Sequence, residues 1–140
     1  MKPVKWGIIS TANIGVAKVI PGMLKSKDLE VVAIASRKLK PAREWAGKLG
    51  IPKAYGSYEE MLADPEIEAV YNPLPNHLHV PLTLAAARAG KHVLCEKPIT
   101  LDADECRRAF GVARSAGLLL VEAAWTQWHP RTHRVGAMVA

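Results

Sequence analysis

Short apolar segments of strand-forming residues alternate with longer segments of helical character along almost the whole chain. Three of the helical segments end at a glycine that comes before the next apolar segment, namely Gly50, Gly90 and Gly117. Glycine is common directly after a helix because it reaches the left-handed backbone conformation without strain. A chain that repeats strand, helix and strand in this way favours a parallel sheet, because each helix returns the chain to the edge where the next strand begins.

The sequence places strands and helices in regular alternation. The expected strands are Val4–Ile9, Glu30–Ala35, Lys53–Tyr55, Ala69–Asn72, His92–Cys95 and Leu118–Glu122. The expected helices are Ile14–Lys25, Pro41–Leu49, Tyr58–Ala63, Leu78–Ala89 and Ala103–Ala116. Pro41 and Asp102 suit helix starts, since proline lacks the N–H that a first turn leaves free and aspartate accepts a hydrogen bond from such an N–H.

Most of the strands are apolar on both faces, as in the runs "VVAIA" and "LLLV". Helices should therefore cover both faces of the sheet. Right-handed crossovers then predict an α/β fold, a doubly wound parallel sheet of the Rossmann type in a single domain. In such a fold ligands bind outside the carboxyl ends of the strands, where the strand order reverses.

Composition limits the classes of function. Hydrophobic residues make up 49% and charged residues 23% of the chain, as in a globular protein. The apolar runs stay short of the roughly 18 residues that cross a membrane, and Met1–Pro3 leads straight into a core strand without a signal peptide. Cys95 and Cys106 are read as reduced thiols, and His77 and His79 lack further ligands for a metal site. We expect a cytoplasmic protein without a metal.

The net charge of +6 is compatible with a nucleic-acid partner, an acidic small molecule or neither, and the local cluster of basic residues favours a small phosphorylated ligand. Basic residues are scattered except for one concentration, Arg37, Lys38, Lys40 and Arg43. A nucleic-acid partner is not expected, because the chain has no long basic run and no aromatic RNA-binding strand.

The segment "STANIG" after the first expected strand has the form of a nucleotide-binding turn, with Ser10 and Ala12 where glycines are usual. Ala12 adds only one methyl group, Ser10 adds a hydroxyl, and Gly15 keeps the helix close to the strand. Amide groups at the start of the following helix would point at an anion. Taken alone, this segment fits a phosphate cradle and an ordinary strand-to-helix corner equally well.

Ser36, Arg37 and Lys38 follow the second strand, where an NAD-binding domain usually has an acidic residue that binds the ribose hydroxyls. Two cations and a hydroxyl at this place favour the 2′-phosphate of NADP, with NAD as the alternative. The competing interpretation is a solvated patch at a helix entry.

Two more strand ends carry polar side chains. After the fourth strand Asn76 could hold a helix N-terminus, and after the fifth strand Lys97 stands in "CEKP". Such a lysine could orient a substrate hydroxyl or help to move its proton, or it could form a surface ion pair with Glu96.

Four motifs in order, "WGIISTANIG", "ASRK", "PLPNHLHVPLTLAAARAGKHVLCEKPIT" and "VEAAWTQWHP", cover nearly all of the chain. Together they resemble the amino-terminal NAD(P)-binding domain of the Gfo/Idh/MocA oxidoreductases, the group that contains glucose-fructose oxidoreductase and inositol dehydrogenase. The most specific part is "NHLH" followed by "GKHVLCEKP". The turn at Trp6 and "EAAWT" are most similar to the NADP-linked sugar and dihydrodiol dehydrogenases of the group.

The resemblance implies a role for each strand end. Pyrophosphate would lie against Ser10, Thr11, Ala12, Asn13, Ile14 and Gly15, and the adenosine ribose with its 2′-phosphate against Ser36, Arg37 and Lys38. Leu74, Asn76 and His79 would line the nicotinamide side. Glu96 and Lys97 match the family's "EKP", whose lysine lies next to nicotinamide and substrate and would be the catalytic residue. Trp125 would contact the cofactor from the stretch that crosses toward the substrate domain. The resemblance also implies a cis peptide bond before Pro98, and it leaves the contact at Gln127 open, because an arginine is frequent there.

The same resemblance sets the expected domains. Residues 1–122 would form the nucleotide-binding domain, and residues 123–140 would begin the connection to a C-terminal α/β substrate domain that this sequence lacks. Hydride transfer to or from a sugar or polyol and assembly into a homo-oligomer would both need that domain. The alternative is a non-catalytic NAD(P)-binding module, so the sequence leaves open whether this chain is itself an enzyme.

Overall fold

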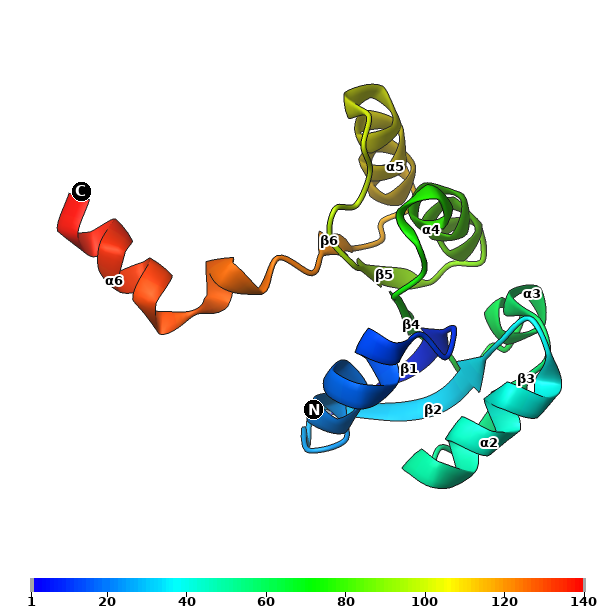
Figure 1. Ribbon diagram of the computed structural model, residues 1–140. Helices are drawn as coiled ribbons and strands as arrows, with labels where there is room; N and C mark the ends of the chain where they lie inside the picture. The colour runs from blue at the N-terminus through cyan, green and yellow to red at the C-terminus, as the bar shows by residue number, and fades with distance from the viewer. Residues whose placement is uncertain (1, 140) are drawn as a thin grey trace.

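The computed structural model describes residues 2–139 and contains one parallel six-stranded sheet (Figure 1). The strands are β1 (Val4–Ile9), β2 (Leu29–Ala35), β3 (Lys53–Tyr55), β4 (Ala69–Asn72), β5 (His92–Cys95) and β6 (Leu120–Glu122). Their order in the sheet is β3-β2-β1-β4-β5-β6. The chain leaves β1 in one direction and returns at β4 in the other, so the carboxyl ends of β1 and β4 border the switch point of the doubly wound fold.

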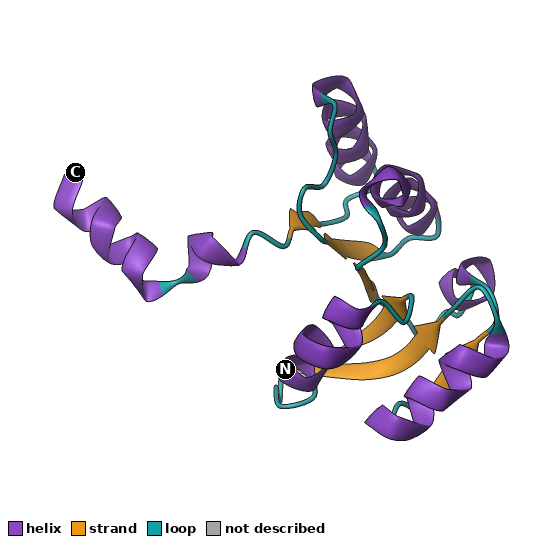
Figure 2. Ribbon diagram, in the orientation of Figure 1, coloured by secondary structure: helices purple, strands orange, loops and turns teal. Residues whose placement is uncertain are grey.

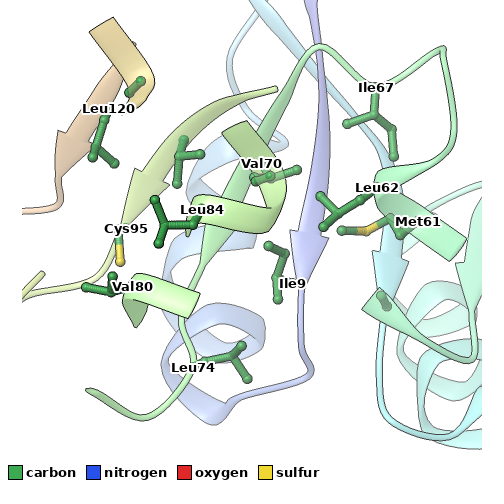
Figure 3. Close-up of a cluster of buried hydrophobic side chains, with 14 of the residues drawn as sticks. Ile9, Met61, Leu62, Ile67, Val70, Leu74, Val80, Leu84, Cys95 and Leu120 are labelled. Atoms are coloured by element: carbon green, nitrogen blue, oxygen red, sulfur yellow. The ribbon is translucent and has the colours of Figure 1, made fainter. Parts of the chain in front are cut away.

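Helices cover both faces of the sheet (Figure 2). They are η1 (Gly15–Val19), α1 (Ile20–Met23), α2 (Leu39–Leu49), α3 (Tyr58–Leu62), η2 (Asn76–Leu78), α4 (His79–Arg88) and α5 (Ala103–Ser115). Helices α3, α4 and α5 pack on one face, where Ile9, Val70, Leu84 and Cys95 lie in the larger core (Figure 3). Helices η1, α1 and α2 pack on the other face against Ile8, Ile34 and Tyr71. Because neighbouring strand residues point to opposite faces, the "II" of β1 serves both cores.

The α/β parallel fold expected from the sequence is confirmed. Strands β1, β3, β4 and β5 have the expected bounds, while β2 begins one residue earlier and β6 begins two residues later. Helix α2 begins at Leu39, so Pro41 lies inside its first turn, where a missing N–H is tolerated. Asp102 caps α5 as expected, because its side chain accepts from the N–H groups of Asp104 and Glu105.

The expected helix Ile14–Lys25 is wrong in its interior and at its end. Residues Gly15–Val19 form a π-helical stretch in which the N–H of Ile20 donates to the carbonyl of Gly15, and regular helix continues only to Met23. Pro21 supplies the reason, because proline has no N–H to donate and its ring clashes with the carbonyl four residues earlier. The wider π turn moves that carbonyl away and lets the helix pass the proline.

The end of the chain forms two helices that the sequence analysis did not predict, η3 (Trp125–Trp128) and α6 (Pro130–Val139). Helix α6 extends away from the sheet, and none of its described residues is buried (Figure 1). No helix within residues 2–139 combines the length and apolar character that crossing a bilayer requires.

A buried carboxylate joins β3 to the loop between α3 and β4. Asp64 accepts hydrogen bonds from Lys53 Nζ at 2.6 Å, Tyr55 Oη at 2.7 Å and the N–H of Glu66 at 2.9 Å, and its side chain is 8% exposed. Burial alone would raise the pKa of Asp64, but these hydrogen bonds outweigh it and lower the pKa from 3.8 to about 2.

We expect acid to weaken the fold through Asp64. Its folded-state pKa lies below the unfolded value, so the carboxylate stabilises the fold above about pH 4, and this contribution is lost as the pH falls towards 2. Because Lys53 is partly exposed, we expect Asp64→Asn to remove about 1 to 2 kcal/mol at pH 7. Urea unfolding at pH 7 and pH 3 measures this, with the exposed Asp28→Asn as control. Equal pH dependence of Asp64→Asn and the unsubstituted chain would contradict the assignment.

Candidate functional site

Two cavities lie along the carboxyl ends of the strands and meet at Leu74, which lines both. The small cavity, of about 330 Å³, lies at the ends of β1 and β2 and is lined by Ser10, Thr11, Ala12, Ser36, Arg37, Tyr58, Leu74, Pro75, His77 and Leu78. The large cavity, of about 710 Å³, extends over β4, β5 and β6. Its lining comprises Ile14, Lys18, Val19, Tyr71, Pro73, Leu74, Asn76, His79, Leu94, Glu96, Lys97, Val121, Glu122, Ala123, Trp125 and Trp128. Leu74 lies between them at the switch point, and the two cavities together are called the crevice below.

The turn after β1 is held by its serine. Ser10 has a φ of 95°, a left-handed conformation that is unusual for a residue other than glycine. Its N–H donates to the carbonyl of Ala35 at 3.1 Å, and its Oγ accepts from the N–H of Ala12 at 3.0 Å. Gly15 brings the helix close to β4, because a Cβ there would lie 3.4 Å from the ring of Pro73. The turn is therefore built into the ends of both neighbouring strands.

Arg37 supplies positive charge at the small cavity. Its side chain is exposed, and among residues 2–139 neither Arg37 nor Lys38 forms a salt bridge. Tyr58 lines the same cavity. Burial raises the pKa of its hydroxyl, and the Arg37 guanidinium opposes that rise. The cavity thus offers an uncompensated guanidinium beside an aromatic ring, an arrangement suited to an anionic ligand with a planar group.

His79 is buried and faces protein groups only. Its Nδ1 lies 2.8 Å from the carbonyl of Pro98, its Nε2 lies 2.6 Å from the carbonyl of Leu74, and 1% of the residue is exposed. A neutral imidazole donates to one of these carbonyls and a protonated imidazole to both. In either form no ring nitrogen is left for a ligand.

The expectation that Asn76 holds a helix N-terminus is wrong. A 3-10 turn begins there without a side-chain cap, and α4 follows it at His79, also without one. The buried Asn72 shapes this corner instead, because its side chain accepts from the N–H of Leu74 at 3.3 Å and donates to the carbonyl of His79 at 3.2 Å.

Glu96 and Lys97 follow β5 at the large cavity. Glu96 Oε1 accepts from the hydroxyl of Tyr71 at 2.7 Å, and Glu96 Oε2 accepts from the N–H of Lys97 at 3.3 Å. Burial, together with the hydrogen bond to Glu96, raises the pKa of Tyr71, so its hydroxyl stays protonated and donates. Lys97 is exposed and belongs to none of the salt bridges within residues 2–139, which leaves its ammonium group open to the cavity. The Lys97–Pro98 peptide bond is cis, as the resemblance implied.

The crevice brings together most of the residues singled out from the sequence. Ser10, Thr11, Ala12, Ser36 and Arg37 lie at the small cavity, and Ile14, Asn76, His79, Glu96, Lys97 and Trp125 lie at the large one, with Leu74 between them. Asn13, Gly15 and Lys38 line neither cavity. The side chain of Gln127 lies outside the described part of the chain.

Sequence reasoning missed lining residues at two strand ends that it did not inspect. Tyr58, which lines the small cavity, lies shortly after β3. Glu122 is the last residue of β6 and Ala123 follows it, and both line the large cavity. Parallel strands end at the same edge of a sheet, so the expected strand bounds already contained this signal.

The titratable side chains of residues 2–139 do not gather into a set of metal ligands. Among the described residues no group of three or more histidine, cysteine or acidic side chains could hold an ion. Burial raises the pKa of the Cys95 thiol to about 12, so this cysteine stays protonated behind the crevice and is unsuited to act as a nucleophile.

Comparison with known proteins identifies relatives over the whole domain. Residues 4–123 match the family model of the GFO_IDH_MocA oxidoreductases, described as an oxidoreductase family with an NAD-binding Rossmann fold. An uncharacterized oxidoreductase of Rhizobium meliloti is 54% identical over 140 residues, which are 100% of this chain and 42% of that protein. D-xylose 1-dehydrogenase (NADP(+)) 2 of Haloferax volcanii is 50% identical over 96% of this chain and 41% of its own length.

A solved structure shows the same fold. The 3-ketoreductase KijD10 of Actinomadura kijaniata, in complex with TDP-benzene and NADP, superposes with a TM-score of 0.93 and is 38% identical. The match covers 98% of this chain and 43% of KijD10. The chain thus spans less than half the length of these relatives.

Proposed function

The chain belongs to the Gfo/Idh/MocA oxidoreductase family with its NAD-binding Rossmann fold, and on that premise we propose that it binds NADP and serves a dehydrogenase acting on a sugar or polyol. NADP, when bound, supplies the site that accepts or donates a hydride. The protein groups of the crevice bind and orient the two partners and handle the proton of the substrate hydroxyl.

The observation that carries the preference for NADP is the end of β2. Arg37 reaches the small cavity without an acidic partner, and Ser36 stands beside it in the position where NAD-binding domains have a carboxylate. A carboxylate would repel a ribose 2′-phosphate, whereas a guanidinium binds it through charge-assisted hydrogen bonds. Lys38, exposed at the start of α2, adds a second cation next to this place.

The turn after β1 fits a pyrophosphate. Its amide groups begin a helix, Ala12 leaves the approach open, and the Ser10 hydroxyl accepts from Ala12 while its own proton remains to be donated. The crevice then leads past Leu74 into the large cavity, where the nicotinamide end would face Lys97 and Glu96.

Lys97 is the proposed catalytic residue. Its ammonium group is exposed at the large cavity and has no salt-bridge partner within residues 2–139, so it can donate a hydrogen bond to a substrate oxygen. Reduction of a carbonyl needs a proton at that oxygen, and oxidation of the alcohol releases one. Trp125 and Trp128, 62% and 70% exposed, add aromatic surface at the same cavity, which suits the apolar face of a sugar ring.

Two relatives support the class of substrate, since one is named D-xylose 1-dehydrogenase (NADP(+)) 2 and the other, of Mus musculus, trans-1,2-dihydrobenzene-1,2-diol dehydrogenase. Residues 1–122 would then be the nucleotide-binding unit, and residues 123–140 the connection towards the substrate domain. The exposed helix α6 favours this division. A cytoplasmic location stays a prediction from the sequence.

The second candidate function is a binding module without turnover. Lys97 lines a cavity at which the side chains of Trp125 and Trp128 are largely exposed. Catalysis depends on positioning, so an open cavity favours cofactor binding over chemistry. Cofactor reduction by this chain with any sugar or polyol would exclude it.

Titration of the chain with NADPH and NADH tests the proposal. We expect NADPH to bind about 10- to 100-fold more tightly, because one or two charge-assisted hydrogen bonds to the 2′-phosphate contribute roughly 1.5–3 kcal/mol. Nicotinamide fluorescence measures both affinities under the same conditions. Equal affinity would contradict the assignment of Arg37, and no binding of either nucleotide would contradict the proposed function.

A further inference from the structure

The short segment Lys97–Ile99 is tied to elements that lie far from it in the sequence. On one side the carbonyl oxygen of Pro98 lies 2.8 Å from His79 Nδ1. On the other side the N–H of Ile99 donates to Glu122 Oε1 at 2.9 Å. The backbone that carries Lys97 is therefore held from both flanks, by the start of α4 and by the end of β6.

His79 makes this segment continuous with the other wall of the crevice. Its second ring nitrogen lies 2.6 Å from the carbonyl of Leu74, the residue that lines both cavities. Because the ring is buried and both nitrogens face carbonyl oxygens, a shift of the Pro98 backbone would leave Nδ1 of a buried imidazole without its partner. The geometry couples the position of the Lys97 loop to the wall at Leu74.

Glu122 links the Lys97 segment to the sheet. It is the last residue of β6 and pairs in register with Cys95, the last residue of β5, so its backbone position is fixed by the ladder. Its half-buried carboxylate crosses to the loop that leaves β5 and accepts from the N–H of Ile99. That N–H belongs to a residue that is 5% exposed, so without Glu122 it would be a buried donor without a partner.

We propose that His79 and Glu122 are positioning residues that fix the backbone of Lys97 and thereby the place of the nicotinamide end in the large cavity. The inference rests on the proposed function of the crevice, but it concerns residues to which neither the motif nor the fold assigned this role. Neither side chain is required to touch substrate. Their effect passes through the two backbone hydrogen bonds that flank Lys97.

The test compares Glu122→Ala with Glu122→Gln in the chain as it is. Glutamine keeps a side-chain oxygen that can accept from the N–H of Ile99, whereas alanine does not. For Glu122→Ala we expect hydrogen exchange at the Ile99 amide to be about 10-fold faster or more, and NADPH affinity to fall about 5- to 20-fold. Adenosine 2′,5′-bisphosphate, which lacks nicotinamide, should bind within about twofold of the unsubstituted chain. Glu122→Gln should restore both the exchange rate and the NADPH affinity.

His79→Leu provides an independent variant, because leucine is of similar size but can donate to neither of the two carbonyls. We expect the same pattern, a loss for NADPH without a loss for adenosine 2′,5′-bisphosphate. Glu44→Ala, an exposed substitution on α2, is the matched control for the loss of a carboxylate. Thermal unfolding of every variant checks that the chain is folded.

The outcomes separate this inference from the proposed function. If the unsubstituted chain binds neither nucleotide, both are overturned. If the unsubstituted chain binds NADPH and adenosine 2′,5′-bisphosphate, and Glu122→Ala binds NADPH as tightly as the unsubstituted chain, the positioning role is overturned and the proposed function stands. If Glu122→Gln fails like Glu122→Ala, the charge of Glu122 acts instead of its hydrogen bond, and the positioning role is likewise overturned.

Discussion

Replacing Arg37 by alanine is expected to weaken NADP+ binding by about 10- to 100-fold and to leave NAD+ affinity within about twofold. Arg37 is exposed at the small cavity and forms no salt bridge within residues 2–139. Its removal therefore leaves no acidic side chain of these residues without an ion-pair partner. The substitution therefore removes attraction to the 2′-phosphate and leaves the rest of the crevice unchanged. Isothermal titration with both nucleotides measures the two affinities.

Two further variants separate local contact from overall charge. Arg43→Ala removes the same charge from the exposed face of α2, outside the small cavity, and should change both affinities by less than about twofold at physiological ionic strength. Arg37→Lys keeps the charge but loses the two-pronged hydrogen-bond geometry, so an intermediate loss is expected. An equal loss of NADP+ and NAD+ affinity in Arg37→Ala would show that the arginine does not read the 2′-phosphate.

The strands were predictable because their signal is local. Runs of β-branched and apolar residues mark β1 to β6 without reference to the rest of the chain, and the sheet order agrees with the doubly wound fold that right-handed crossovers favour. The π-helical interior of the first helix was not predicted, although Pro21 in the sequence is a signal for such a distortion. Helices η3 and α6 were not predicted, because their residues were interpreted as a connecting segment. None of the described residues of α6 is buried, so no packing against the sheet marks it in the sequence.

In the candidate site, too, local features were predictable from the sequence and contacts between distant residues were not. Residues that directly follow a strand, such as Arg37 and Lys97, were found because their place in the sheet follows from the strand bounds. Contacts across the sheet were not, since Tyr71 with Glu96 and Ile99 with Glu122 join residues more than twenty positions apart. The buried state of His79 is of this kind as well. Its two carbonyl partners come from two different loops, so the sequence alone suggested a ligand contact where the fold has an internal link.

Introducing a carboxylate at Ala12 is expected to lower the affinity for NADP+ and NAD+ together, by about 100-fold or more, since like charges brought together in a binding site cost several kcal/mol. Ala12 lines the small cavity, and its N–H lies within the turn that Ser10 closes. Both nucleotides carry the same pyrophosphate, so Ala12→Glu should not distinguish them, in contrast to Arg37→Ala. The same nucleotide titrations measure the loss.

The fold should survive this substitution, because a carboxylate near a helix N-terminus is favourable towards the helix dipole. Ala17→Glu, on the exposed face of the same helix, supplies the matched control and should leave both affinities within about twofold. The unfolding temperature of Ala12→Glu should stay at or above that of the unsubstituted chain. Undiminished binding by Ala12→Glu would mean that the turn after β1 is an ordinary strand-to-helix corner. Loss of both nucleotides there, with loss of NADP+ alone in Arg37→Ala, would assign the pyrophosphate to the first strand end and the 2′-phosphate to the second.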